Sequence, residues 1–290
     1  MQSGSDFSGI NEAKHRMDHI YDHCDPRLYC STLEHLNYSI PDNAKPICQA
    51  LIEQLRKRLN RDTVHVIDLG CSYGVNAALL KYDLSMEDLY ARWDIDRRGD
   101  DSCKEIIQSE QEFFENLDQA DKLEITGIDP ARNAINFAEE TGLVDTGLAV
   151  DLESEPFPEP VEQGLASADL LMSTGCVGYV TEKSFDRLMP AISREQPAWI
   201  ANFVLRIFPY QPIQNCLETW GYETEKLEDK TFLQRKVAST DEQEKIIRQL
   251  KDRNIDPSGQ EADGNLMAEF YLSRPTEEVR QQPLHQLLQP

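Results

Sequence analysis

The chain has 290 residues, of which 40% are hydrophobic, so it is long enough to bury a full core as one large domain with additions. Its 29 Lys and Arg residues against 52 Asp and Glu residues give a formal net charge of −23, which repels nucleic acid and is compatible with a cationic substrate or with a merely solvated acidic surface. No apolar stretch approaches the ~18 residues of a membrane span and no leader is recognisable, so we expect a cytoplasmic monomer or homodimer with no membrane and no nucleic-acid partner.

Seven cysteines are scattered along the chain, and no two of them form a C-x-x-C pair. A zinc site or a disulfide framework needs closer, patterned spacing. The sequence therefore predicts reduced thiols and no metal site at these positions, which are Cys24, Cys30, Cys48, Cys71, Cys103, Cys176 and Cys216.

Residues 1–60 are predicted to form an N-terminal helical cap. Apolar residues at helical spacing indicate helices over about 11–22 and 46–59. The segment between them, 25–41, is rich in Tyr, His and Pro and cannot be one long helix.

A strand, a glycine turn and a helix are predicted over 64–80. The β-branched run ends near Asp68, and Gly70 lets a ligand approach the backbone closely. The first N–H groups of the following helix lack partners and carry a partial positive charge, so the turn can hold a ligand carboxylate or phosphate. The charged region 82–122, with helices expected over about 87–93 and 103–117, is longer than a normal crossover and is a candidate lid.

Strands and helices then alternate, which predicts an α/β fold with a doubly wound, mostly parallel seven-stranded sheet and a core over 61–275. Residues 276–290 are predicted to be a disordered tail. An antiparallel pair, over 222–227 and 265–273, is expected to finish the sheet around an insertion at about 231–260. The other predicted elements are strands over 123–130, 146–151, 168–174 and 198–205 and helices over 133–140, 182–189 and 211–220.

Three successive strand ends carry a carboxylate: Asp68, Asp129 and Asp151. Ligands of open parallel sheets bind at such ends. The second carboxylate is placed to accept both hydroxyls of a ribose, and the third to accept from an adenine amine. A dinucleotide fingerprint would need Gly at the positions of Ser72 and Val75, so a pyrophosphate fits poorly, whereas an adenosine bearing an amino acid fits, with its ammonium near Asp68.

Each of these residues also has a structural interpretation. Asp68 is compatible with a strand-end cap, Asp129 with an acid at a helix N-terminus, and Asp151 with ordinary loop composition. Cys71 and Cys176 are more typical of small packed residues than of nucleophiles.

Four segments resemble, in order and spacing, class I S-adenosylmethionine-dependent methyltransferases of the small-molecule type: 67–74, 127–130, 150–152 and 169–174. One departure is a serine where many members of that family carry the middle Gly of the turn. The resemblance implies S-adenosyl-L-methionine as cofactor and the following binding residues: Asp68, Gly70, Cys71, Ser72, Tyr73 and Gly74 for the methionine end, Asp129 and Pro130 for the ribose, Asp151 and Leu152 for the adenine, and Ser173, Thr174 and Gly175 beneath the sulfonium.

The methyl acceptor is expected to be a small organic molecule, because the Asp/Asn-Pro-Pro-aromatic tetrad of adenine N-methylating enzymes and a basic groove are both absent. His15, His19 and His23 share a helical face, which we interpret as a polar face and not as a metal site. The acceptor atom stays open among O, N, C and S. Two alternatives also stay open, a catalytically silent methyltransferase-like subunit and, less favoured, a nicotinamide-dependent oxidoreductase. Candidate catalytic residues are His23 and Tyr179, and candidate substrate-binding residues are Tyr21, Tyr29, Tyr38 and Tyr179.

Overall fold

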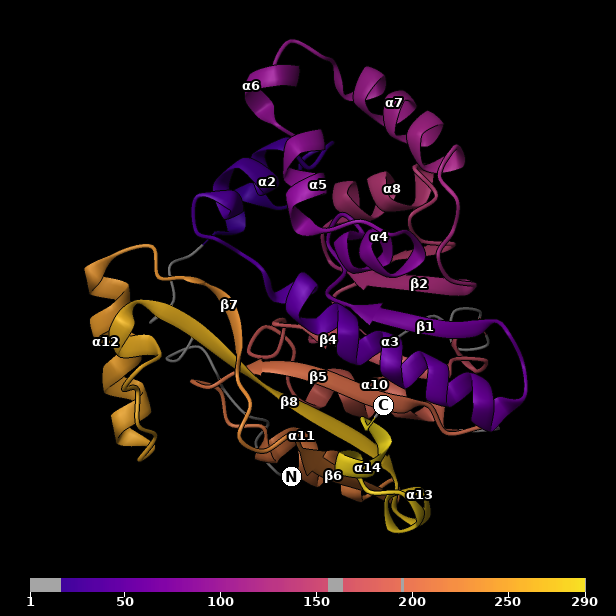
Figure 1. Ribbon diagram of the computed structural model, residues 1–290, viewed down its shortest axis with the longest axis vertical. Coiled ribbons are helices and arrows are strands. Elements are labelled where there is room, and N and C mark those ends of the chain that lie inside the picture. The colour runs from indigo at the N-terminus through magenta and orange to yellow at the C-terminus, as the bar shows by residue number, and fades with distance from the viewer. Residues whose placement is uncertain (1–16, 156–163, 194–195, 290) are drawn as a thin grey trace.

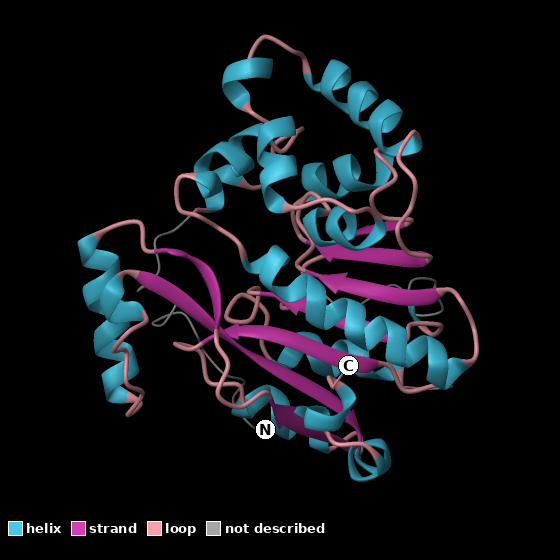
Figure 2. Cartoon of the chain, viewed as in Figure 1, coloured by secondary structure: helices cyan, strands magenta, loops and turns pink. Residues whose placement is uncertain are grey.

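The computed structural model of the protein describes residues 17–155, 164–193 and 196–289. Within these ranges, one eight-stranded sheet runs in the order β3-β2-β1-β4-β5-β8-β6, and β7 pairs with β8 off this path (Figures 1 and 2). The strands are β1 (Val64–Leu69), β2 (Leu123–Asp129), β3 (Thr146–Ala149), β4 (Leu170–Thr174), β5 (Trp199–Leu205), β6 (Tyr222–Lys226), β7 (Phe232–Lys236) and β8 (Asn265–Pro275).

The predicted doubly wound, mostly parallel fold is confirmed. Strands β1 to β5 pair in parallel, and β8 runs antiparallel to β5, β6 and β7. The main path of the described sheet has seven strands in the order typical of class I methyltransferases. The eighth strand, β7, lies inside the expected insertion.

Helices cover both faces of the sheet. In β1, Val64 and Val66 join one buried cluster with α3, α4 and α8, whereas Ile67 and Leu69 join a second cluster with α10 and α11. Side chains alternate between the faces of a strand, and burial of both faces explains why β5 is almost continuously apolar. None of the described helices is long and apolar enough to cross a membrane. The helices are η1 (Asp18–Ile20), α2 (Arg27–Glu34), α3 (Ile40–Leu59), α4 (Val75–Lys81), α5 (Met86–Arg92), α6 (Ile95–Arg98), α7 (Cys103–Glu115), α8 (Arg132–Glu140), α10 (Glu182–Ile192), α11 (Gln211–Glu218), α12 (Thr240–Asp252), η2 (Glu261–Asp263), α13 (Thr276–Gln281) and α14 (Leu284–Leu287).

The region between α4 and β2 folds together with the N-terminal segment. In Figure 1, α2, α5, α6 and α7 form a helical layer beyond α4 and α8. Glu110 of α7 is fully buried and accepts hydrogen bonds from Arg92 (2.6 Å), Trp93 (3.0 Å) and Arg98 (2.8 Å), which joins α5, α6 and α7. Arg27 of α2 donates to the carbonyl of Arg98 in α6. The buried carboxylate of Glu110 is therefore paired with partners from α5 and α6, and these contacts hold the helices of the layer together.

The predicted N-terminal cap differs from the structure in two respects. Helix α3 begins at Ile40, runs through Pro46 and packs against α4, β1, β4 and β7, so it is a core helix. Helix α2 is not predicted by the sequence. Of the helix expected over 11–22, only residues from 17 onward lie in the described part, and there η1 spans 18–20.

The predicted disordered tail is wrong, because residues 276–281 and 284–287 form α13 and α14. Leu284 and Leu287 are buried. The backbone N–H of Leu284 donates to Glu225 of β6 (2.7 Å), and Gln54 of α3 donates to the carbonyl of Leu287 (3.3 Å). Two leucines are a weak signal for a helix in the local sequence. In the fold they are buried against β6 and α3, and this burial stabilises the two short helices.

Candidate functional site

A cavity of about 300 Å³ opens at the carboxyl ends of β1, β2 and β4. This is the edge at which open parallel sheets bind ligands. A larger hollow of about 500 Å³ beside Trp220 and three prolines has no ionisable side chain in its lining other than Tyr222 and offers no charge to a ligand. The predicted residues that line the 300 Å³ cavity are Gly70, Ser72, Asp129, Pro130, Asp151, Leu152, Thr174, Gly175, Tyr21, Tyr29, Tyr38 and Tyr179.

The glycine turn brings the backbone to the cavity wall. A Cβ on Gly70 (φ +75°) would lie 2.6 Å from Cβ of Cys176, so only glycine fits there. Ser72 adopts a left-handed backbone conformation with φ of +50°, which glycine adopts without strain. Its N–H donates to Asp129 (3.0 Å), and its hydroxyl oxygen is buried with no partner among the described residues. The turn therefore holds a serine in a backbone conformation that favours glycine.

Asp129 joins the turn to α8. It ends β2 and accepts hydrogen bonds from the N–H groups of Ser72 (3.0 Å) and Ala131 (2.9 Å). Burial raises the pKa of its carboxyl group, and these two hydrogen bonds oppose the rise. Ala131 precedes the first residue of α8, so the structural interpretation of Asp129 as an acid at a helix N-terminus agrees with these contacts. The same carboxylate faces the cavity.

Asp68 lies behind the turn and does not line the cavity. It is 1% exposed, and the Asn76 amide donates to both of its oxygens, at 3.0 and 3.2 Å. Burial raises the pKa of Asp68 to about 7, the Asn76 hydrogen bond lowers it and the charge of Asp129 raises it further. The amide nitrogen of Asn76 also lies 3.0 Å from the hydroxyl of Thr174, so Asp68 is linked to the cavity wall through one side chain.

Asp151 is exposed and belongs to a local turn. Its carboxylate accepts from the N–H of Glu153 (2.9 Å) and from the hydroxyl of Ser154 (2.7 Å). Strand β3 ends at Ala149, two residues earlier than predicted. These contacts agree with the ordinary-loop interpretation, although Asp151 and Leu152 both line the cavity.

Tyrosines from the N-terminal segment cover the cavity. The ring of Tyr29 lies edge-on to those of Tyr21 and Tyr38, with centroids 5.5 and 6.4 Å away. Burial raises the pKa of Tyr29 and raises that of Tyr38 to about 12. Both phenols can donate a hydrogen bond to a ligand in the cavity. Tyr179, in the loop after β4, is 51% exposed at the rim.

Several predicted site residues lie elsewhere. His23 is exposed, its Nε2 is 2.7 Å from the carbonyl oxygen of His19, and it does not line the cavity. His15 lies outside the described residues, so the three-histidine face is not tested. Cys71, Tyr73, Gly74 and Ser173 also lie outside the cavity lining: the Tyr73 hydroxyl contacts the backbone of His23, and Ser173 donates to Asn202 (2.6 Å).

Gln234 of β7 lines the cavity and is not predicted by the sequence. It is 7% exposed, and its side-chain oxygen has no hydrogen-bond partner among the described residues. Nothing in the local sequence marks it, because its place depends on the pairing of β7 with β8.

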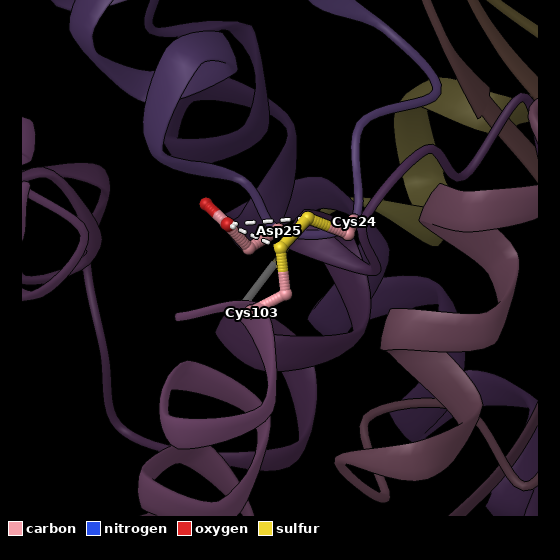
Figure 3. Close-up of side chains that lie close together, drawn as sticks. All are labelled: Cys24, Asp25 and Cys103. Atoms are coloured by element: carbon pink, nitrogen blue, oxygen red, sulfur yellow. Dashed lines mark hydrogen bonds between the residues drawn. A yellow bond between two sulfur atoms is a disulfide. The ribbon is translucent and has the colours of Figure 1, made fainter. Parts of the chain in front are cut away.

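The predicted reduced state of all seven cysteines is wrong for two of them. Cys24 and Cys103 form a disulfide with Cα atoms 5.9 Å apart, which ties the N-terminal segment to the start of α7 (Figure 3). Both sulfurs lie 3.6 Å from the carboxylate of Asp25, which Arg27 pairs at 2.9 Å. The two cysteines are 79 residues apart in sequence, so spacing alone could not reveal the pair.

No family model and no curated protein matches the sequence. Among the solved structures similar to this chain are three methyltransferases, each with a TM-score below 0.5. The plantazolicin methyltransferase BpumL, solved with SAH, is 13% identical, with 81% of this chain and 84% of that chain covered and a TM-score of 0.38. Phosphoethanolamine N-methyltransferase 2 of Haemonchus contortus is 15% identical, with 78% and 52% covered and a TM-score of 0.35. Precorrin-6y C5,15-methyltransferase of Geobacter metallireducens is 9% identical, with 79% and 88% covered and a TM-score of 0.35.

Proposed function

We propose that this protein transfers a methyl group from S-adenosyl-L-methionine to a small organic acceptor. The observation that carries the proposal is the cavity at the carboxyl ends of β1, β2 and β4, where the turn at Gly70 and the carboxylate of Asp129 face the same space. The strand order that forms this edge is the one typical of class I methyltransferases.

The residues present fit such a donor. Gly70 brings the backbone to the cavity wall, where Cys176 leaves no room for a Cβ, and the buried Ser72 hydroxyl oxygen has no partner among the described residues. Asp129 and Asp151 have carboxylate oxygens that can accept from ribose hydroxyls and from an adenine amine. When bound, the donor supplies an activated methyl group on a sulfonium.

The protein's own residues have to align the acceptor and exclude water. Tyr21, Tyr29 and Tyr38 cover the cavity from the N-terminal side and can orient an acceptor by hydrogen bonds. No described histidine, lysine or further carboxylate lies among these tyrosines in the cavity lining besides Asp129 and Asp151. Catalysis is therefore ascribed to positioning for in-line attack.

Calorimetric titration with S-adenosylhomocysteine tests the proposal. We expect the wild-type protein to bind it, and Asp129→Asn to weaken binding about tenfold or more because a charged hydrogen-bond acceptor is lost. Glu115→Gln, which changes an exposed acid at the end of α7, is the matched control and should bind like wild type. Absence of binding to the wild type at millimolar ligand would refute the proposed function.

A further inference from the structure

Strand β7 contains a bulge at Gln234. Leu233 pairs with Met267 and Arg235 pairs with Leu266, so two consecutive partners on β8 face three residues of β7. Gln234 and Arg235 are neighbours and are both buried. In a regular strand with one buried face, successive side chains point to opposite faces, so two neighbours would not both be buried. A bulge re-aims one side chain, and here that side chain is Gln234.

The start of α3 holds this bulge. The N–H of Ser39 donates to the carbonyl of Gln234 (2.9 Å), and the Asn43 amide donates to the carbonyl of Leu233 (2.8 Å). On the other side, the guanidinium of Arg235 pairs with Glu242 of α12 at 2.6 and 3.1 Å. The backbone of Gln234 is thus fixed from both sides.

The side chain of Gln234 lies against the end of β4. A Cβ on Gly175 would be 2.6 Å from Nε2 and 3.0 Å from Oε1 of Gln234, so the amide occupies the space that only glycine leaves. The residue is 7% exposed and lines the cavity, and its Oε1 has no partner among the described residues. A buried oxygen without a partner costs free energy, which a ligand N–H group can recover.

The surroundings favour a positively charged ligand at this oxygen. The described lining of the cavity contains no Lys, Arg or His, and its charged groups are Asp129 and Asp151. Arg235, next to Gln234, is neutralised by Glu242. Four tyrosine rings line the same space, and such rings attract ammonium groups.

We propose that Gln234 recognises the methyl acceptor and that this acceptor is an amine whose N–H group donates to Oε1 of Gln234. The proposal rests on the proposed function. In the reaction, the bound ammonium first loses one proton to water, and the free-base nitrogen then forms an N–C bond while the S–C bond of the donor breaks. The sulfonium becomes a neutral thioether, and the methylated nitrogen carries the positive charge. This step needs no base among the tyrosines.

The test uses three probes of one shape and different charge: phenethylamine, phenethyl alcohol and phenylacetate. Each is titrated at neutral pH into the full chain saturated with S-adenosylhomocysteine, whose neutral sulfur does not repel an ammonium. We expect phenethylamine to bind about tenfold more tightly than phenylacetate, because hydrogen bonds to charged groups are strong and the cavity is acidic. Gln234→Leu should lower the affinity for phenethylamine about tenfold. The matched variant Gln234→Glu keeps an acceptor oxygen and should retain the wild-type affinity for phenethylamine.

An equal loss of affinity for S-adenosylhomocysteine and for phenethylamine in Gln234→Leu would mean that the substitution disturbs the whole cavity, and it would overturn the assignment of Gln234. Equal or tighter binding of phenylacetate or phenethyl alcohol to the wild type would overturn the amine assignment, and this comparison needs no variant to fold. Absence of binding by all three probes would overturn it too. If Gln234→Leu binds phenethylamine as wild type does, Gln234 is not the recognising residue. Failure of the wild type to bind S-adenosylhomocysteine would instead refute the proposed function itself, and the two failures are therefore distinct.

Discussion

The buried carboxylate of Asp68 couples stability to pH. The pKa of Asp68 is raised by burial from 3.8 to about 7, so between these values the folded protein holds a proton that the unfolded chain has lost. Its contribution to stability is fully present below about pH 4 and is lost as the pH rises towards about 7.

We expect Asp68→Asn to remove this pH dependence. The free energy of unfolding, measured with urea at about pH 5 and about pH 8, should fall between these two pH values. In Asp68→Asn this fall should be smaller than in wild type by about 2 to 4 kcal/mol. Asp118→Asn, at an exposed position, is the control and should keep the wild-type profile. An unchanged profile in Asp68→Asn would mean that Asp68 is ionised throughout this range.

At the level of single residues, part of the cavity lining could be predicted from the sequence. Gly70, Asp129 and Leu152 lie at or just after the ends of predicted strands, and parallel strands end at one edge of the sheet. His23 could not be placed, because its direction depends on the short η1 helix and on its contact with His19. Gln234 could not be found, because a bulge is set by strand pairing and leaves no mark in composition.

Among the elements, the two C-terminal helices show most clearly how burial decides structure. Leu287 is 1% exposed and lies beside Gln54 of α3, whereas His285 in the same short helix is exposed. Four helical residues cannot be stable alone, so α14 depends on this contact.

Leu287→Ala should therefore destabilise the protein by about 2 to 4 kcal/mol, because it leaves a cavity between α14 and α3. Thermal and urea unfolding would measure the change. His285→Ala removes an exposed side chain from the same helix and should have almost no effect. Equal stability of Leu287→Ala and wild type would show that the C-terminal helices do not belong to the core.

For the molecule as a whole, the disulfide links parts that are distant in sequence. Cys24 lies shortly after Tyr21, which lines the cavity, and Cys103 begins α7 in the region between α4 and β2. The enclosed loop contains α3, β1 and the glycine turn. A crosslink across 79 residues restricts the unfolded chain strongly.

We expect Cys103→Ser to lower the free energy of unfolding by about 4 kcal/mol under oxidising conditions, by loop-entropy reasoning. Reductant should lower the melting temperature of wild type and leave that of Cys103→Ser unchanged. Cys216→Ser, at a half-buried free cysteine, should behave as wild type. If alkylation and mass spectrometry find seven free thiols in the native protein, the crosslink is absent.

The sequence by itself determined the alternation of strands and helices from β1 to α11, the doubly wound sheet and the carboxylates at its edge. These follow from local periodicity and from the glycine turn, which act over a few residues. Only the tertiary structure decided that β7 bulges to present Gln234, that Cys24 meets Cys103, that α3 joins the core and that the tail is helical. Each of these depends on contacts between residues far apart in the chain, whose energies no local pattern encodes.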